Sequence, residues 1–288
     1  MNVSGMDRYS LESSFGEGPS GTVYKAWDNE LNRHVAIKIA HRGKGSFKAA
    51  GPLIGNLIHP NIITIYKVDD ILDVSYLSME YVNGPDLRAF CEKDFLLKPQ
   101  KSVELIIEIL KGLFFGHSKG FIHRNIKPSN IILNETGAPK IADFGIVQVA
   151  GKNHQMGFWG APDYMSPEQL KGRPVNLQAD IFSLGCVLYE LLSGHKPFRA
   201  ESRYGVISRI INNSPEPLEN SVPCREILEE VITKALSKEP DARYQNCTEF
   251  AVDLSKALGL LNKQEQSKKG SILRSITDRV NVFRTSPA

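Results

Sequence analysis

The chain has 288 residues, of which 41% are hydrophobic and 23% charged, and this composition excludes collagen-like, disulfide-stabilised and intrinsically disordered proteins. Its net charge of +3 is too small for the broad basic field of a protein that binds nucleic acid non-specifically. No apolar run approaches the roughly 20 residues that a membrane-spanning helix needs. The cysteines show no C-x-x-C spacing and the start of the chain has no signal-peptide pattern, so we expect a cytoplasmic protein.

Residues 9–82 are predicted to form a mostly antiparallel β-sheet. Segments rich in β-branched and aromatic residues lie at 22–27, 35–39, 62–66 and 75–80. Between them, residues 46–58 show helical spacing of apolar side chains, although Gly51-Pro52 weakens that prediction.

The pattern changes at Asn83-Gly84-Pro85, after which helical periodicity dominates. Apolar residues recur at intervals of three and four over 103–114 and over 181–192, and the second segment is apolar nearly all round, as a central core helix would be. These patterns predict a short lead over 1–8, a small lobe over 9–82, a larger lobe over 83–261 and a basic tail over 262–288. For the tail we favour a linker or a helix docked on its own domain over a contact with anionic lipid or a partner.

A glycine-rich stretch, Gly16-x-Gly18-x-x-Gly21-x-Val23, lies between two predicted strands. In a dinucleotide-binding fold the third glycine would open a helix, so that fold is disfavoured. Glycines let backbone N–H groups approach phosphates without interference from a Cβ atom. Taken alone, the motif is also compatible with a β-turn that binds nothing.

Charged and amide side chains follow in three further motifs. Lys38 ends Val35-Ala36-Ile37-Lys38 on an inward-facing strand position, where a cation needs an anion, although a surface lysine is the simpler interpretation of this motif alone. The run from His123 to Asn130 reads His-Arg-Asn-Ile-Lys-Pro-Ser-Asn, and a short predicted strand separates it from Asp143-Phe144-Gly145. An amide and a carboxylate on either side of a hairpin offer the hard oxygen ligands that Mg²⁺ prefers.

In this order, and with Ser166-Pro167-Glu168, the segment 180–185 and Arg243 after them, these motifs resemble those of eukaryotic-type Ser/Thr protein kinases of the bacterial style. Lys127, two residues after Asn125, matches the Ser/Thr-specific pattern. The resemblance implies an α+β, bilobal protein-kinase fold with a small antiparallel β-sheet N-lobe and a larger, mostly helical C-lobe. It also implies ATP and Mg²⁺ (or Mn²⁺) as cofactors and a protein substrate or partner.

The same resemblance implies which residues hold the nucleotide. Lys38 would bind the α- and β-phosphates, and Asn130 and Asp143 would bind the metal ions. The glycines would cover the phosphates, and the remaining residues would surround the base and the ribose. These ATP-binding residues are Gly16, Gly18, Gly21, Val23, Ala36, Met79 as the gatekeeper, Glu80 and Val82 of the hinge, Asp86 for the ribose, and Ile132.

The chain departs from the kinase pattern at three positions that the resemblance assigns to catalysis. Asn125 occupies the position of the catalytic aspartate, and an amide cannot accept the proton of a substrate hydroxyl, a step typically worth about 10²–10⁴ in rate. Ala50 stands where a glutamate should meet Lys38, and residues 39–60 contain no Asp or Glu, which leaves Asp143 or a phosphate as the nearest anion. Ala161 replaces the usual threonine that bonds the catalytic aspartate and Lys127.

Regulation by phosphorylation of the segment after Gly145 is not expected on Ser or Thr. Residues 146–165 contain neither, and Tyr164 is the only hydroxyl there. Arg124 therefore has no phosphoserine or phosphothreonine partner in that segment.

Two hypotheses from different functional classes follow. The favoured one is a pseudokinase that binds ATP and Mg²⁺, with phosphoryl transfer lost or strongly impaired. The alternative is an active Ser/Thr kinase that transfers the ATP γ-phosphate to protein, silenced here by an engineered Asp-to-Asn change at Asn125 or using an unusual site. A change at one position does not explain Ala50 and Ala161, and this favours the first. A small-molecule kinase is less favoured because Ser166-Pro167-Glu168 is typical of a peptide-docking lobe.

Overall fold

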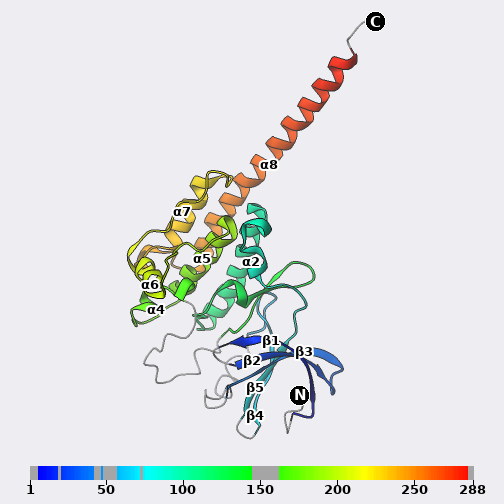
Figure 1. Ribbon diagram of the computed structural model, residues 1–288, viewed down its shortest axis with the longest axis vertical. Coiled ribbons are helices and arrows are strands. Elements are labelled where there is room, and N and C mark those ends of the chain that lie inside the picture. Colours follow the sequence, from blue (N-terminus) through cyan, green and yellow to red (C-terminus); the bar gives the residue numbers. More distant parts are fainter. Residues whose placement is uncertain are drawn as a thin grey trace.

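The computed structural model describes residues 6–18, 21–41, 47, 57–71, 74–144 and 162–284, with the backbone alone over 268–284. A sheet lobe and a helical lobe lie side by side, and the strands nearest the start of the chain belong to the sheet lobe (Figure 1). This arrangement confirms the expected bilobal α+β fold. Most of the helix predicted over 46–58, and with it Ala50, lies outside the described residues, as does Ala161.

The sheet lobe is a five-stranded sheet in the order β1-β2-β3-β5-β4. Every neighbouring pair of strands is antiparallel, as predicted. Its strands are β1 (Tyr9–Gly18), β2 (Gly21–Asp28), β3 (Arg33–Ile39), β4 (Ile65–Ile71) and β5 (Val74–Glu80).

The central strand β3 is buried on both of its faces. Val35 and Ile37 pack in one apolar cluster with Tyr9 and Tyr76, whereas Ala36 packs in a second cluster with Met79. Successive side chains of a strand point to opposite faces. Lys38 therefore shares the face of Ala36, which is the face turned to the helical lobe.

The strand predicted over 62–66 is displaced along the chain, because β4 begins only at Ile65. Ile62 forms a parallel bridge to Ile141 instead, and Ile63 donates its backbone N–H to the Ile141 carbonyl at 2.9 Å. The Ile141 N–H in turn donates to the Asn61 carbonyl at 2.8 Å. Ile62 and Ile63, together with the Asn61 carbonyl, thus pair with the helical lobe rather than with β5, and they join the two lobes.

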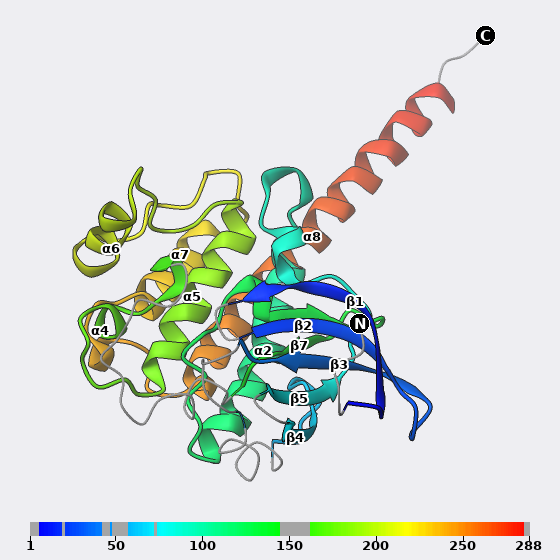
Figure 2. The same cartoon turned by 60° about the horizontal axis from the view of Figure 1, so that its bottom comes forward.

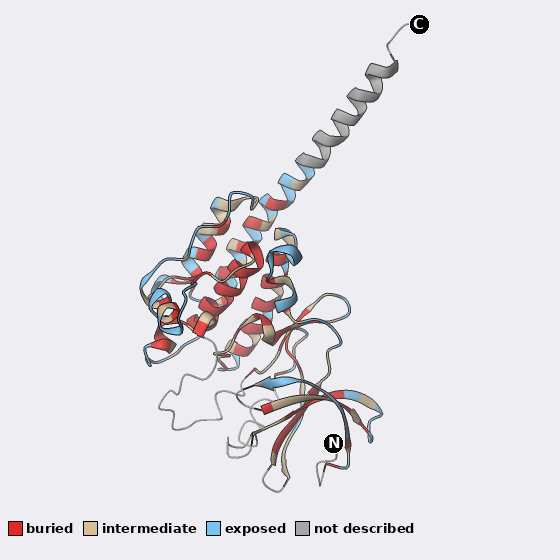
Figure 3. Ribbon diagram, viewed as in Figure 1, coloured by how far each residue is buried: buried red, intermediate tan, exposed pale blue. Residues whose placement is uncertain are grey.

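The helical lobe is built around α5 (Gln178–Ser193), all of whose residues are buried, as its sequence predicts (Figure 3). A hairpin of β6 (Ile131–Leu133) and β7 (Pro139–Ile141) packs against α2 (Pro99–Ser118) of this lobe, and in the view of Figure 2 β7 stands at the boundary with strands β2 and β3 of the sheet lobe. The other helices are α4 (Pro167–Leu170), α6 (Arg203–Asn212), α7 (Arg225–Ala235) and α8 (Cys247–Arg284). Single 3-10 turns are η2 (Leu87–Phe90), η3 (Lys93–Phe95), η4 (Pro128–Asn130), η5 (Pro162–Tyr164) and η6 (Pro240–Ala242).

A buried ion pair ties α4 to the segment before α8. Both guanidinium Nη atoms of Arg243 donate to the Glu168 carboxylate at 2.8 Å. The remaining donors of Arg243 reach the carbonyls of Ser237, Gln178 and Lys238 at 2.7 to 3.0 Å. Arg243 is 2% exposed and Glu168 is 4% exposed, so this ion pair is buried.

The last helix continues well past the position where the sequence changes composition. α8 packs against α2 through fully buried apolar residues, and it then extends away from the body as one helix to Arg284 (Figure 1). These residues, spaced four, three and four apart, are Phe250, Leu254, Ala257 and Leu261. Among the described helices, none is both long enough and apolar enough to cross a membrane.

Candidate functional site

Lys38 and Asp143 form an ion pair between the two lobes. The Lys38 ammonium lies 2.7 Å from Oδ1 and 2.8 Å from Oδ2 of Asp143. Lys38 is 3% exposed, so its charge has almost no access to water. The sequence offers no carboxylate over 39–60 and left Asp143 or a phosphate as the expected anion; in the structure Lys38 contacts Asp143.

The charge of Lys38 decides the protonation of Asp143. Burial of the carboxyl acts to raise its pKa, but the charge and hydrogen bonds of Lys38 outweigh burial, so the pKa of Asp143 is lowered. Asp143 is therefore an anion at neutral pH, and it is available both to Lys38 and to a metal cation.

The backbone holds Asp143 in an uncommon conformation. Its φ is +61°, a left-handed value that costs energy for a residue with a Cβ atom and that is frequent at functional sites. The next residue, Phe144, packs edge-on against His123 with ring centroids 5.0 Å apart. A Cβ atom at Gly116 of α2 would overlap the Phe144 ring, so this glycine makes the room that the ring occupies.

The loop that carries Asn125 is held by hydrogen bonds to the buried carboxylate of Asp180. Asp180, at the start of α5, accepts the backbone N–H of His123 at 2.8 Å and that of Arg124 at 2.7 Å. Arg124 has a φ of +63°, and its carbonyl accepts the side-chain amide of Gln169 at 2.9 Å. Bonds to an ionised acceptor are about twice as strong as neutral ones, so Asp180 fixes a strained loop.

Asn125 itself is positioned through its backbone. Its N–H donates to Nδ1 of His123 at 3.2 Å, and its carbonyl accepts the Asn130 amide at 2.9 Å. Burial lowers the pKa of His123, so the ring is neutral, with Nε2–H donating to the Ala142 carbonyl at 2.8 Å. The Asn125 amide side chain makes no hydrogen bond to any other residue that the structure describes.

Asn130 and Asp143 fit a hard divalent cation. The two residues flank the β6–β7 hairpin, and the Ala142 N–H, next to Asp143, donates to the Asn130 carbonyl at 2.8 Å. Because the Asn130 amide nitrogen is engaged by Asn125, its amide oxygen is the atom that remains as a ligand. An amide oxygen and a carboxylate, completed by phosphate oxygens and water, are a donor set that suits Mg²⁺.

The residues predicted to surround the base share one apolar cluster. Ala36 and Met79 pair across β3 and β5 and are both nearly buried. Val23 of β2, Val82 and Ile132 of the hairpin pack against the same cluster. Since β2, β3 and β5 belong to the sheet lobe and Ile132 to the helical lobe, the structure brings these predicted residues together from both lobes.

Glu80 of the predicted hinge forms an ion pair with Lys140, which the sequence analysis did not predict. Both carboxylate oxygens of Glu80 accept from the Lys140 ammonium of β7, at 2.8 and 3.0 Å. The Glu80 side chain also accepts the Thr64 N–H at 3.2 Å. The side chain of Glu80 is therefore engaged by protein, and so is its backbone N–H, which donates to the Thr64 carbonyl at 2.8 Å.

Asp86, predicted for the ribose, is already engaged. Its carboxylate accepts Nε and Nη2 of Arg88 at 2.9 and 2.7 Å, and the Arg88 N–H at 2.9 Å. It thereby caps η2, and a ribose hydroxyl would have to compete with the Arg88 guanidinium.

The glycine motif spans the junction of β1 and β2. Gly16 pairs with Val23 and Gly18 with Gly21, while residues 19–20 lie outside the described residues. Gly21 has a φ of +150°, and a Cβ atom there would overlap the Ile39 carbonyl of β3. The close approach of β2 to the end of β3 therefore requires glycine at this position.

Lys127 lies within the electrostatic reach of the ion pair. Burial lowers its pKa, the charge of Asp143 acts in the opposite direction, and the charge of Lys38 reinforces the lowering. Two cations thus share the surroundings of one carboxylate, and this concentrates positive charge where phosphates would lie.

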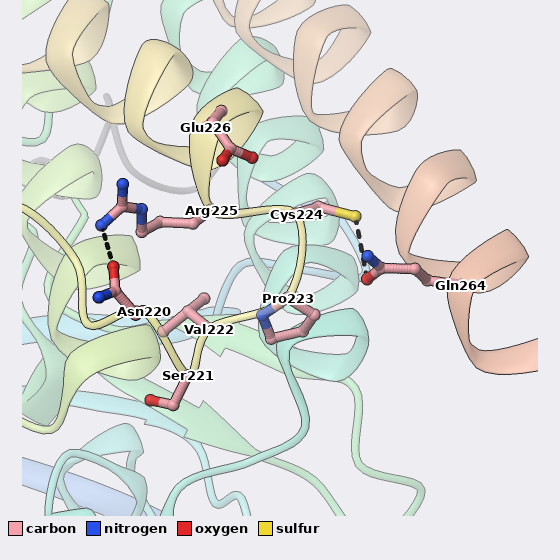
Figure 4. A pocket seen from close by; sticks show the side chains of 8 residues that line it. All are labelled: Asn220, Ser221, Val222, Pro223, Cys224, Arg225, Glu226 and Gln264. Atoms are coloured by element: carbon pink, nitrogen blue, oxygen red, sulfur yellow. Dashed lines mark hydrogen bonds between the residues drawn. The ribbon is translucent and has the colours of Figure 1, made fainter. Parts of the chain in front are cut away.

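A separate hollow of about 310 Å³ lies at the far end of the helical lobe, between the loop before α7 and α8 (Figure 4). Its lining includes Cys224, whose thiol lies 3.4 Å from the Gln264 amide oxygen, together with Arg225 and Glu226. It includes none of the predicted site residues and no arrangement of an acid, a base and a nucleophile.

Comparison with known proteins agrees with these features. Residues 9–253 match the family model described as "Protein kinase domain". The chain is 35% identical over 270 residues to the probable serine/threonine-protein kinase SCO3848 of Streptomyces coelicolor, covering 87% of this chain and 40% of that protein. It is 33% identical over 264 residues to serine/threonine-protein kinase PknB of Mycobacterium leprae, with 86% and 42% covered.

A clostridial relative shows the same extent of similarity. The probable serine/threonine-protein kinase CA_C1728 of Clostridium acetobutylicum is 33% identical over 262 residues, with 86% of this chain and 40% of that protein covered. The chain thus spans about two fifths of the length of the curated relatives it matches.

Proposed function

The chain belongs to the protein kinase family as a bacterial-type Ser/Thr kinase domain, and from that membership we propose that it binds ATP with Mg²⁺ while transferring phosphoryl groups poorly or not at all. One observation carries the proposal. The contact of Lys38 with Asp143 supplies the groups for phosphate and metal, whereas the loop position of the general base holds the amide of Asn125.

Binding is proposed to exchange the partners of Lys38. The phosphates of the nucleotide would meet the Lys38 ammonium and release Asp143 toward the metal, which Asn130 would also bind. Bound Mg²⁺ would neutralise charge on the phosphates. The base would lie against Val23, Ala36, Met79, Val82 and Ile132, and the glycines at 16, 18 and 21 would cover the phosphates.

Phosphoryl transfer is proposed to fail because no group removes the proton of the substrate hydroxyl. The Asn125 amide can orient a substrate hydroxyl but cannot take its proton, a loss of about 10²–10⁴ in rate, or roughly 3–5 kcal/mol. Lys127 remains to stabilise charge. Ala50 provides no carboxylate to hold Lys38 in place once Asp143 has turned to the metal.

The alternative is an active kinase whose position 125 carried an engineered change, or one that uses an unusual site. Asp180 anchors the loop so firmly that a carboxylate at position 125 would be placed without rearrangement, and this specific feature supports the alternative. In either case we propose that the lobes span 9–82 and 83–261, with 262–288 as an extension.

Transfer of labelled γ-phosphate to a generic Ser/Thr peptide tests the proposal. We expect little transfer from the unmodified chain, partial recovery in Asn125→Asp, and a further increase when Ala50→Glu is added. Asn125→Asp with Lys38→Met serves as the inactive control. Full, family-like turnover from Asn125→Asp alone would refute the pseudokinase proposal and favour the alternative.

A further inference from the structure

Three buried polar side chains, Asp180, His117 and Cys247, form a hydrogen-bonded series next to the loop that carries Asn125, where α2, α5 and α8 meet. Oδ2 of Asp180, besides accepting the His123 N–H, lies 2.8 Å from Nε2 of His117 in the last turn of α2. Nδ1 of the same ring lies 3.5 Å from Sγ of Cys247, the first residue of α8. Asp180 is 0% and Cys247 2% exposed, and the His117 side chain is 6% exposed.

The geometry of this series decides which ring nitrogen of His117 carries a hydrogen. A carboxylate that already accepts backbone N–H groups can only accept, so Nε2 of His117 must carry a hydrogen. We infer that Nδ1 of the same ring is an acceptor, because its neighbour is the Cys247 thiol. Cys247 supplies the donor that Nδ1 needs. Burial raises the pKa of the Cys247 thiol, so the sulfur keeps its proton.

We infer that Cys247 is a positioning residue for the loop His123–Asn125, acting through the tautomer of His117 and the carboxylate of Asp180. In the other tautomer the Nε2 lone pair would face Oδ2 at 2.8 Å, and two acceptors at that distance repel each other. The repulsion would fall on the carboxylate that holds the strained backbone of Arg124.

The start of α8 is itself fixed, so the thiol has a defined place. The Asn246 side-chain oxygen accepts the Glu249 N–H at 2.9 Å, and the Asn246 amide donates to the Glu249 carboxylate at 2.9 Å. This reciprocal capping begins the helix at Cys247 and turns that residue inward. The inference concerns the placement of the loop and is independent of whether the domain transfers phosphate.

Nuclear magnetic resonance of the ¹⁵N-labelled full chain tests the inference, with His117 assigned by its loss in His117→Gln. We expect Nε2 to be protonated and Nδ1 to be an unprotonated acceptor, both in the unmodified chain and in Cys247→Ser, which keeps a donor. In Cys247→Ala, we expect the His123 and Arg124 amides to exchange with solvent about ten- to a hundredfold faster, the size typical when a buried acceptor loses its donor.

Cys186→Ala is the matched control, because Cys186 is also a fully buried cysteine and lies on α5. It should change those two amides no more than it changes the amides of the α5 core. A proton on Nδ1 in the unmodified chain would overturn the inference. So would equal acceleration by both alanine variants, or failure of Cys247→Ser to retain protection. If Cys247→Ala does not fold, the tautomers of the unmodified and serine chains decide the question.

Discussion

Replacement of Asp143 by asparagine should destabilise the nucleotide-free domain, because it leaves the ammonium of Lys38 without a counter-charge. The Lys38 side chain is 4% exposed and that of Asp143 is 21% exposed. Breaking a buried ion pair by removing one partner typically costs about 3–5 kcal/mol. An asparagine oxygen still accepts one hydrogen bond and Asp143 has some access to water, so we expect about 3 kcal/mol.

Urea unfolding at neutral pH without nucleotide or metal measures this free energy. Glu219→Gln is the matched control: it removes one carboxylate from the Lys93–Glu219 pair, whose side chains are 62% and 50% exposed. An exposed pair contributes about 1 kcal/mol or less, so the control should barely change the free energy of unfolding. Equal, small losses in the two variants would show that Lys38 does not depend on Asp143, and the argument from burial would be refuted.

Three further outcomes are expected. ATP with Mg²⁺ at 100 times its dissociation constant should add about 2.7 kcal/mol of stability, and the absence of both a thermal shift and a calorimetric heat would contradict an intact pocket. The pKa of Asp143 is lowered in the folded state, so its contribution to the free energy of unfolding should be fully present above the unfolded pKa of about 3.9 and be lost as pH falls through the folded pKa. If the free energies of unfolding of the unmodified chain and of Asp143→Asn differ by the same amount at pH 7 and in strong acid, this reasoning is wrong. Glu168→Gln should cost about 3–5 kcal/mol in urea unfolding, because Arg243 stays buried without its counter-charge; a loss under about 1 kcal/mol would contradict that reasoning.

Much of the fold and of the site can be predicted from short stretches of the sequence. The apolar run of α5 predicts a helix buried on all sides, since such a run is stable only inside a core. The alternation along β3 places Lys38 on the face of Ala36, and the spacing of Asn130 and Asp143 about a short strand predicts the hairpin that they flank. Each of these signals depends on neighbours a few residues apart, so the chain carries it without reference to distant segments.

The partners of polar side chains, in contrast, depend on packing between distant segments. The β-branched residues Ile62 and Ile63 predict a strand equally well whether they pair with β5 or with β7, and only the docking of the lobes selects Ile141. His117 meets Asp180 across 63 residues and Cys247 across 130, since these three side chains come together only when α2, α5 and α8 pack. Hydrophobic periodicity records which face of an element is buried, whereas a buried donor or acceptor must find its partner in whichever segment the tertiary structure brings against it.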